Sequence, residues 1–363
     1  MSVSLAKIVA GAKIRSLALI GLSKNVGKTT TTNYLLEALI SEKHYRSDEL
    51  ALTSLGLDGE ATDALTGLPK PRYVPQPGLI IATAEELLHL AEREGAQFQR
   101  LKRLSGRTAL GPVTVARVLR PGRVTVAGPT LLHDLHRAID QLGRLGANLS
   151  VVDGAINRVG AAAPTITNAC IVCTGASVGA TPELVARRTA DVVRRLSMQQ
   201  ASHVDRYGVP PLQSRLCMSI AEDEEAVTNR YYGNNTPLDE SGWIVKHMLT
   251  TQKPIFMLDG ALTDELARTL LAELHKVRTN DHRAELVVRD ATRVFCHSSV
   301  IERLYDKGLG IRVLNPIQIL AITANPFTPE YLCSSQHLLE SLAKALPESH
   351  PPIIDVISGL SCS

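Results

Sequence analysis

Residues 17–30 read LALIGLSKNVGKTT, and this stretch decides the fold expected for the chain. It starts as an apolar run of strand length, which ends in a glycine-bounded turn before a helical pattern rich in Thr, Leu and Ala. A strand that enters a helix through such a turn presents unpaired backbone N–H groups at the helix N-terminus, where the helix dipole also favours an anion. The stretch therefore predicts a phosphate-binding loop.

The side chains after Gly27 suit a nucleotide. Lys28 brings positive charge to the terminal phosphates, Thr29 offers its hydroxyl to Mg²⁺, and Thr30 can reach a phosphate oxygen further back along the nucleotide. We predict Lys28 as a catalytic residue. The alternative is a Gly-Lys-Thr turn that holds no ligand. The predicted nucleotide-binding residues are Asn25, Val26, Gly27, Lys28, Thr29 and Thr30.

The spacing of the loop departs from the common G-x4-G-K-T pattern. Five residues separate Gly21 from Gly27, and Leu22 stands where the first glycine is expected. This longer loop resembles that of the dethiobiotin synthetase and cobyrinate amidation group of P-loop proteins more than the loops of the Ras or adenylate kinase groups. The chain has no Asn-Lys-x-Asp or Thr-Lys-x-Asp motif for guanine, so ATP with Mg²⁺ is the expected cofactor.

Short apolar runs alternate with amphipathic stretches through most of the chain. This pattern is typical of parallel strands with crossover helices, so we predict an α/β fold of P-loop NTPase type, with a mostly parallel sheet and helices on both faces. We expect a nucleotide-binding core over 1–200, a polar excursion or linker over 201–243, and a C-terminal α/β part over 244–363, which either stands alone or continues the same sheet. The predicted strands are 17–21, 50–55, 124–128, 149–154, 170–174, 254–260, 293–296 and 311–314.

Three Asp-Gly pairs follow predicted strands, and ligands bind at this end of the strands in open α/β sheets. Asp153 is the predicted Mg²⁺ ligand, because a carboxylate there finds a partner only in a metal or its waters. Asp58 is likewise predicted as a metal ligand and as a catalytic residue. Glu60 can orient water as a general base. The alternative for each is an acidic turn. Asp259 is expected to be a turn residue or to face a partner.

Lys24 lies four residues before Lys28. In the P-loop class that includes nitrogenase iron protein and the septum-site ATPases, a second lysine precedes the loop lysine by five residues. We therefore predict Lys24 as a further catalytic residue that activates hydrolysis across a dimer.

Other clusters are expected to be structural. His133 and His136 lie three apart on one predicted helix but lack a third metal ligand, so we expect solvated side chains. Cys170 and Cys173 form a lone C-x-x-C within an apolar run, which favours buried thiols. The basic cluster 100–103 is expected at a solvated helix end.

Composition excludes several classes of protein. The formal net charge of +3 is small and no basic run is interleaved with aromatic residues, which argues against a nucleic-acid partner. No apolar stretch reaches the ~20 residues of a membrane helix. Lys7, Lys13 and Arg15 interrupt the early apolar segments, so no signal peptide is expected and the predicted location is cytoplasmic.

Six motifs occur in a recognisable order over roughly residues 15–265: GLSKNVGKTTTTNYLL, SLGLDGE, VAGPT, VVDGAINR, CTGASVG and MLDGALTD. Together they resemble the P-loop subunit of lysine 5,6-aminomutase reactivase. The loop by itself places the chain only in the wider dethiobiotin-synthetase-like group.

This resemblance implies an ATPase that acts as a chaperone on an adenosylcobalamin- and pyridoxal-phosphate-dependent aminomutase. ATP would open the mutase so that damaged cobalamin leaves, with Lys28 and Thr29 on phosphate and Mg²⁺ and with Asp153 and Asp58 around the metal. The implied partners are lysine 5,6-aminomutase and a second reactivase subunit, and a homo-oligomer is left open.

A ligase is the rival interpretation from a different class. A dethiobiotin-synthetase-like or amidating synthetase would use the same loop to phosphorylate a small carboxylate, with Lys24 as the cation near the γ-phosphate. An amidating synthetase also needs a glutaminase Cys-His pair, and Cys296-His297 lack the glycine-rich elbow that holds such a nucleophile. A nucleotide sensor without useful hydrolysis is a third interpretation.

Overall fold

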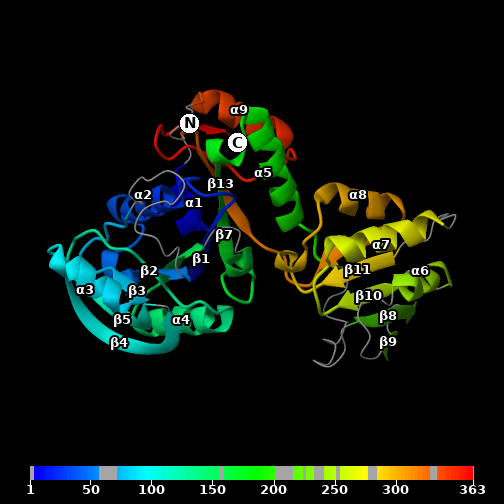
Figure 1. Ribbon diagram of the computed structural model, residues 1–363, viewed down its shortest axis with the longest axis horizontal. Coiled ribbons are helices and arrows are strands. Elements are labelled where there is room, and N and C mark those ends of the chain that lie inside the picture. The colour runs from blue at the N-terminus through cyan, green and yellow to red at the C-terminus, as the bar shows by residue number, and fades with distance from the viewer. Residues whose placement is uncertain are drawn as a thin grey trace. The chain divides into compact units, whose positions relative to one another are not determined.

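A computed structural model of the chain describes residues 4–56, 72–108, 110–154, 159–201, 216–223, 226–232, 241–250, 254–276, 284–327 and 333–362. The chain divides into two compact units (Figure 1). Unit 1 combines Met1–Ala190 with Gln318–Ser363, and unit 2 is Asp191–Ile317. Each unit has its own sheet.

Unit 1 is built on a sheet of ten described strands. They are β1 (Ser16–Gly21), β2 (Leu50–Leu55), β3 (Ile80–Ala84), β4 (Gln97–Thr108), β5 (Gly111–Arg120), β6 (Leu149–Gly154), β7 (Ala169–Gly175), β13 (Ile319–Asn325), β14 (Ile353–Ile354) and β15 (Ser361–Cys362). Their order in space is β15-β14-β13-β7-β1-β6-β2-β3-β5-β4. All neighbours from β14 to β3 are parallel. The β4–β5 hairpin at one edge and β15 at the other pair antiparallel. The predicted α/β class with a mostly parallel sheet is confirmed.

Helices cover both faces of this sheet. Every residue of β1, β2, β3, β6 and β7 is buried, and strand side chains alternate between faces, so neither face is open to solvent. Figure 1 shows α2 (Lys28–Ser41) and α4 (Leu132–Arg144) on opposite sides of the central strands. The buried residues of α4 recur every three to four positions, as expected for an amphipathic helix: Leu135, Ala138, Ile139 and Leu142. The other helices here are α1 (Leu5–Gly11), α3 (Glu85–Arg93), α9 (Ser335–Ala345) and α5 (Pro182–Leu196), which ends in unit 2.

Unit 2 holds a smaller mixed sheet. Its described strands are β8 (Leu216–Asp223), β9 (Ala226–Tyr232), β10 (Ile255–Leu258), β11 (Ala284–Val288) and β12 (Leu309–Val313), in the order β12-β11-β10-β8-β9. β10, β11 and β12 are parallel, whereas β8 pairs antiparallel with both β10 and β9. The described helices wholly within this unit are α6 (Ser241–Thr250), α7 (Asp264–His275) and α8 (Ser298–Asp306).

The observed division of the chain differs from the predicted one. β13 pairs with β7, so residues 318–363 complete the unit 1 sheet and are not part of the unit that contains residues 244–317. The predicted linker 201–243 contains β8 and β9. The polar composition of this segment indicated a loop. However, β9 is an edge strand, and an edge strand can pair through its backbone hydrogen bonds without a continuous row of apolar side chains.

Three local predictions were wrong. Residues 124–128 form no strand, and only Val124 pairs, in a single bridge with Tyr73. A Cβ on Gly128 would lie 1.9 Å from the carbonyl oxygen of Ser54, so this segment crosses the end of β2 at close approach. Residues 293–296 form no strand: Arg293 ends a 3₁₀ turn, and Val294 forms a single bridge with Leu262. The basic cluster 100–103 lies in β4.

Among the described residues, no helix has both the length and the apolar character needed to cross a membrane.

Candidate functional site

The parallel register brings several predicted site segments to one edge of the unit 1 sheet. β1 lies between β6 and β7, with Leu19 opposite Asp153 and Gly21 opposite Cys173. On the far side of β7, Asn325 ends β13 opposite Gly175. The loop that follows β1 therefore emerges at the carboxyl edge of the sheet, beside the strand that carries Asp153. This is the edge at which open α/β sheets bind ligands.

The loop backbone has the geometry of an anion site. Gly27 has φ +83°, in the left-handed region, and Asn25 has φ +59°, which asparagine tolerates better than most residues. The helix α2 begins at Lys28, and the N–H of Thr31 donates to the carbonyl of Gly27 at 2.8 Å. The N–H groups in the turn before Thr31 therefore precede the helical ladder, where a bound anion can accept from them.

Lys28 folds back over the end of β1. A Cβ placed on Gly21 would lie 2.7 Å from the Nζ atom of Lys28 and 2.8 Å from its Cδ. Gly21 thus leaves the space that the lysine side chain fills, and any larger residue would displace the ammonium group. Glycine at this position therefore keeps the ammonium group over the end of β1, although it is one residue further from Gly27 than in the common motif.

Segments distant in the sequence hold the loop in place. Ser177 Oγ donates to the carbonyl of Lys24 at 2.7 Å, and Asn325 Nδ2 donates to the carbonyl of Asn25 at 3.0 Å. A Cβ on Gly27 would lie 3.2 Å from the Cβ of Asn325. The residues that follow β7 and end β13 therefore fix the loop through its main chain, whereas the Lys24 residue itself is exposed.

Sequence reasoning missed the roles of Ser177 and Asn325. Ser177 lies in the motif CTGASVG, and Asn325 precedes Pro326, but neither pattern says which loop the side chain will contact. The contacts join residues 153 and 300 positions apart, and only the strand order brings them together.

Asp153 is nine-tenths buried and has a protein partner. The Tyr73 hydroxyl donates a short hydrogen bond to its Oδ2 atom, and Tyr73 is held by two main-chain hydrogen bonds with Val124 at 3.0 and 2.9 Å. The expectation that only a metal or water would meet this carboxylate was wrong, and the proline-rich sequence around Tyr73 gave no signal of the contact. A carboxylate accepts at about four lone-pair positions, so the hydroxyl leaves room for a metal ion.

Lys28 and Asp153 both act on the buried thiol of Cys173. Burial is the largest effect and raises the pKa of this thiol to about 11; the positive charge of Lys28 lowers it, and the negative charge of Asp153 raises it. The strands β6, which carries Asp153, and β7, which carries Cys173, flank β1, and the Lys28 side chain lies over Gly21 at the end of β1. Burial also raises the pKa of Cys170 to about 12. Both cysteines are fully buried free thiols, as predicted.

The remaining predicted residues fall elsewhere. Asp58 and Glu60 lie outside the described residues. Asp259 belongs to unit 2 and forms an ion pair with Arg289 at 2.6 Å. His133 and His136 are exposed on α4. His133 lies 3.2 Å from Asp134, and His136 lies 3.7 Å from Asp140.

No group of three or more His, Cys, Asp or Glu side chains within the described ranges is placed to hold a metal. Mg²⁺ usually needs only one or two protein ligands, because nucleotide phosphates and water complete its shell. Thr29 at the start of α2 and Asp153 at the end of β6 are compatible with that arrangement. No protein-family model, curated protein sequence or solved structure matches the chain.

Proposed function

We propose that this chain is a P-loop NTPase that binds Mg²⁺–ATP at residues 21–30 and hydrolyses it. The observation that carries the proposal is the loop between β1 and α2, in which Gly27 turns the chain and Lys28 lies over Gly21. A Cβ on Gly21 would meet the Lys28 side chain, and a Cβ on Gly27 would meet Asn325, so glycine at both positions suits this arrangement. The adjacent strand β6 places Asp153 at the same edge of the sheet.

Each residue has a defined task in this proposal. The N–H groups at the start of α2 hold phosphate oxygens, and Lys28 neutralises the terminal phosphates. Thr29 and Asp153 hold the Mg²⁺ shell, and the metal supplies charge stabilisation on the phosphates when it is bound. Lys24 is the further cation proposed to activate hydrolysis.

We infer that this hydrolysis serves the reactivation of a cobalamin-dependent aminomutase. The order of the six motifs supports this finer proposal, and it includes lysine 5,6-aminomutase and a second reactivase subunit as partners. The links from Ser177 and Asn325 to the loop give a means of coupling, because a loop ordered by the γ-phosphate pulls on the segments that hold it.

Steady-state hydrolysis of ATP and GTP with Mg²⁺ tests the first part. We expect ATP to be preferred and Lys28→Ala to lower kcat by about 100-fold or more, since a charge that stabilises the transition state is lost. Lys344→Ala removes an exposed lysine from α9 and is the matched control, which should leave turnover unchanged. Equal turnover in the Lys28 and Lys344 variants would refute the loop assignment.

The role of Lys24 has its own test. Wild-type turnover in the Lys24→Ala variant would refute the proposal that Lys24 activates hydrolysis.

Addition of cobalamin-inactivated lysine 5,6-aminomutase and its second reactivase subunit tests the second part. The ATPase rate should rise with the damaged mutase, and cobalamin should leave it only when ATP is present. A rate that is indifferent to the mutase rejects the reactivase proposal. A rate that instead requires a small carboxylate, with formation of an acyl phosphate, identifies a ligase.

A further inference from the structure

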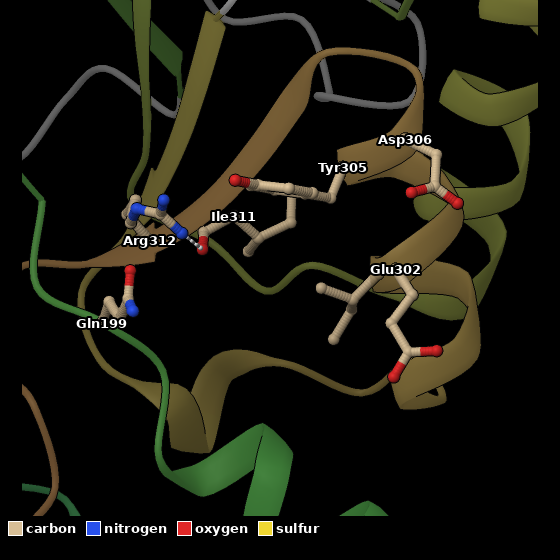
Figure 2. Close-up of a pocket in the computed structure, with 7 residues that line it drawn as sticks. Gln199, Glu302, Tyr305, Asp306, Ile311 and Arg312 are labelled. Atoms are coloured by element: carbon tan, nitrogen blue, oxygen red, sulfur yellow. Dashed lines mark hydrogen bonds between the residues drawn. The ribbon is translucent and has the colours of Figure 1, made fainter.

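Unit 2 contains a pocket of about 350 Å³ between α8 and β12, bordered by Gln199 beyond the end of α5 (Figure 2). Its volume lies at the lower end of the range for small-molecule sites. All the lining residues belong to unit 2, so the pocket is a feature of that unit by itself.

The charges of the pocket are separated. Figure 2 shows Glu302 and Asp306 on one side and Arg312 with Gln199 on the opposite side. The ring of Tyr305 and the side chain of Ile311 lie between them. A ligand that spans the pocket would meet carboxylates at one end, a guanidinium and an amide at the other, and apolar surface in the middle.

The acidic side chains are available to a ligand. Glu302 and Asp306 are exposed, and neither forms an ion pair or a side-chain hydrogen bond within the part of the chain that the structure describes. On the neighbouring helix α7, by contrast, Asp264 pairs with Arg268 of the same helix, and Glu273 pairs with Lys276 just beyond its end, each at 2.5 Å. Two carboxylates one helical turn apart repel each other, and a cation between them relieves that repulsion.

The opposite side retains donors for an anion. Arg312 Nε lies 3.6 Å from Glu285 Oε1, and its Nη1 donates to the carbonyl of Ile311 at 3.3 Å. A guanidinium carries five N–H donors in a fixed fork, so these two contacts do not exhaust it. The contacts hold the side chain in place and leave it able to receive a carboxylate.

Tyr305 exposes 60% of its surface, which is high for a large aromatic residue. An aromatic face attracts an ammonium group, and the ring also covers the methylene groups of a ligand. Phosphate ligands are disfavoured, because Glu302 and Asp306 would repel them.

We propose that this pocket binds a small dipolar molecule, with an ammonium group at Glu302 and Asp306 and a carboxylate at Arg312, of the class of ω-amino acids. The ammonium donates charge-assisted hydrogen bonds to the two carboxylates, and the aliphatic middle packs against Tyr305 and Ile311. The proposal does not depend on nucleotide binding by unit 1.

Isothermal titration of the full chain with 4-aminobutanoate, 6-aminohexanoate and 8-aminooctanoate tests the proposal. At least one should bind saturably with Kd below about 10 mM, as its number of atoms permits. Hexanoate and hexylamine each carry one of the two charges and should bind about tenfold or more weakly than 6-aminohexanoate. Failure of all three amino acids to bind would overturn the proposal. Hexylamine binding as tightly as the best amino acid would also overturn it, and would indicate a site for a cationic side chain of a protein partner.

Variants locate the binding. Glu302→Gln with Asp306→Asn should weaken the best ligand about tenfold or more, since hydrogen bonds to a charged group are lost. Glu265→Gln removes an exposed carboxylate from α7 outside the pocket and should leave Kd unchanged. Tyr305→Phe keeps the ring and should retain binding, whereas Tyr305→Ala should weaken it. Unchanged affinity in the double variant would place the ligand elsewhere and refute the assignment.

Discussion

The loop site of unit 1 and the dipolar pocket of unit 2 are built in opposite ways. At the loop, main-chain groups form the candidate site. They are fixed by Ser177, which follows β7, and by Asn325 in β13, both more than 150 positions away in the sequence. In the pocket, side chains of one helix and one neighbouring strand form most of the site, and its two acids are exposed.

This difference predicts how amino-acid substitutions at each site should affect folding and function. A site made of close-packed backbone has no freedom to relax, so a single added methyl group disturbs both the fold and the function. A site made of exposed side chains can lose its chemistry while the fold remains intact, because surface residues outside the core contribute little to stability. Substitutions in the two regions can therefore break or sharpen the comparison.

The largest expected effect is that of Gly175→Ala. A Cβ at this position would lie 2.3 Å from the carbonyl oxygen of Asn325, so β7 and β13 must separate to admit it. We expect the free energy of unfolding to fall by about 3 kcal/mol or more, as for a severe steric conflict in a core. Urea unfolding followed by circular dichroism measures the change.

Gly143→Ala is the matched control for that substitution. Gly143 lies in α4, and a Cβ there meets no heavy atom within 4 Å. Alanine should stabilise the helix by up to about 1 kcal/mol. If the two variants unfold at the same urea concentration, the close approach of β7 to β13 is not a constraint on the fold.

Tyr73→Phe should have the next largest effect. It removes the hydroxyl that donates to the buried Asp153, and loss of a partner for a buried charged group costs about 1–3 kcal/mol of stability. Differential scanning calorimetry should show a lower Tm. Tyr45→Phe should change stability by less than about 0.5 kcal/mol, because no hydrogen bond of the Tyr45 hydroxyl occurs among the described residues. A Tyr73 variant as stable as the Tyr45 variant would contradict the importance of this contact.

Asn325→Ala should mainly weaken the proposed binding of ATP. It removes the hydrogen bond to the carbonyl of Asn25, so the loop loses part of its preorganisation and KM for ATP should rise by about 3–10-fold. Asn315→Ala removes a similar contact, from an amide to the carbonyl of Arg289 in unit 2, and should leave KM unchanged. An unchanged KM in the Asn325 variant would show that the loop holds its geometry without β13.

The smallest effect on stability is expected in the pocket. Glu302→Gln with Asp306→Asn should change the free energy of unfolding by less than about 0.5 kcal/mol, because both side chains are exposed. Urea unfolding of the double variant measures this. A large loss of stability would show that the two acids support the fold. It would contradict the expectation that the pocket, unlike the loop, can be altered without destabilising the protein.

Local patterns predicted the elements that depend on neighbouring residues. The strands β2 and β6 agree with the expected ranges 50–55 and 149–154. The helix α2 begins at Lys28, within the Gly-Lys-Thr run. Segments with mixed composition were predicted poorly. The basic run 100–103 became part of the edge hairpin, since cations suit the exposed edge of a sheet as well as a helix end.

The sequence by itself determined the α/β class, the turn at Gly27 and the position of Lys28, because these follow from hydrophobic periodicity and from backbone preferences within a few residues. Only the tertiary structure decided that Asn325 and Ser177 hold the loop, that Tyr73 meets Asp153, and that residues 318–363 return to the first sheet. Strand order and register set those contacts. Both depend on how all the apolar faces of the chain pack together, and no short stretch of sequence contains that information.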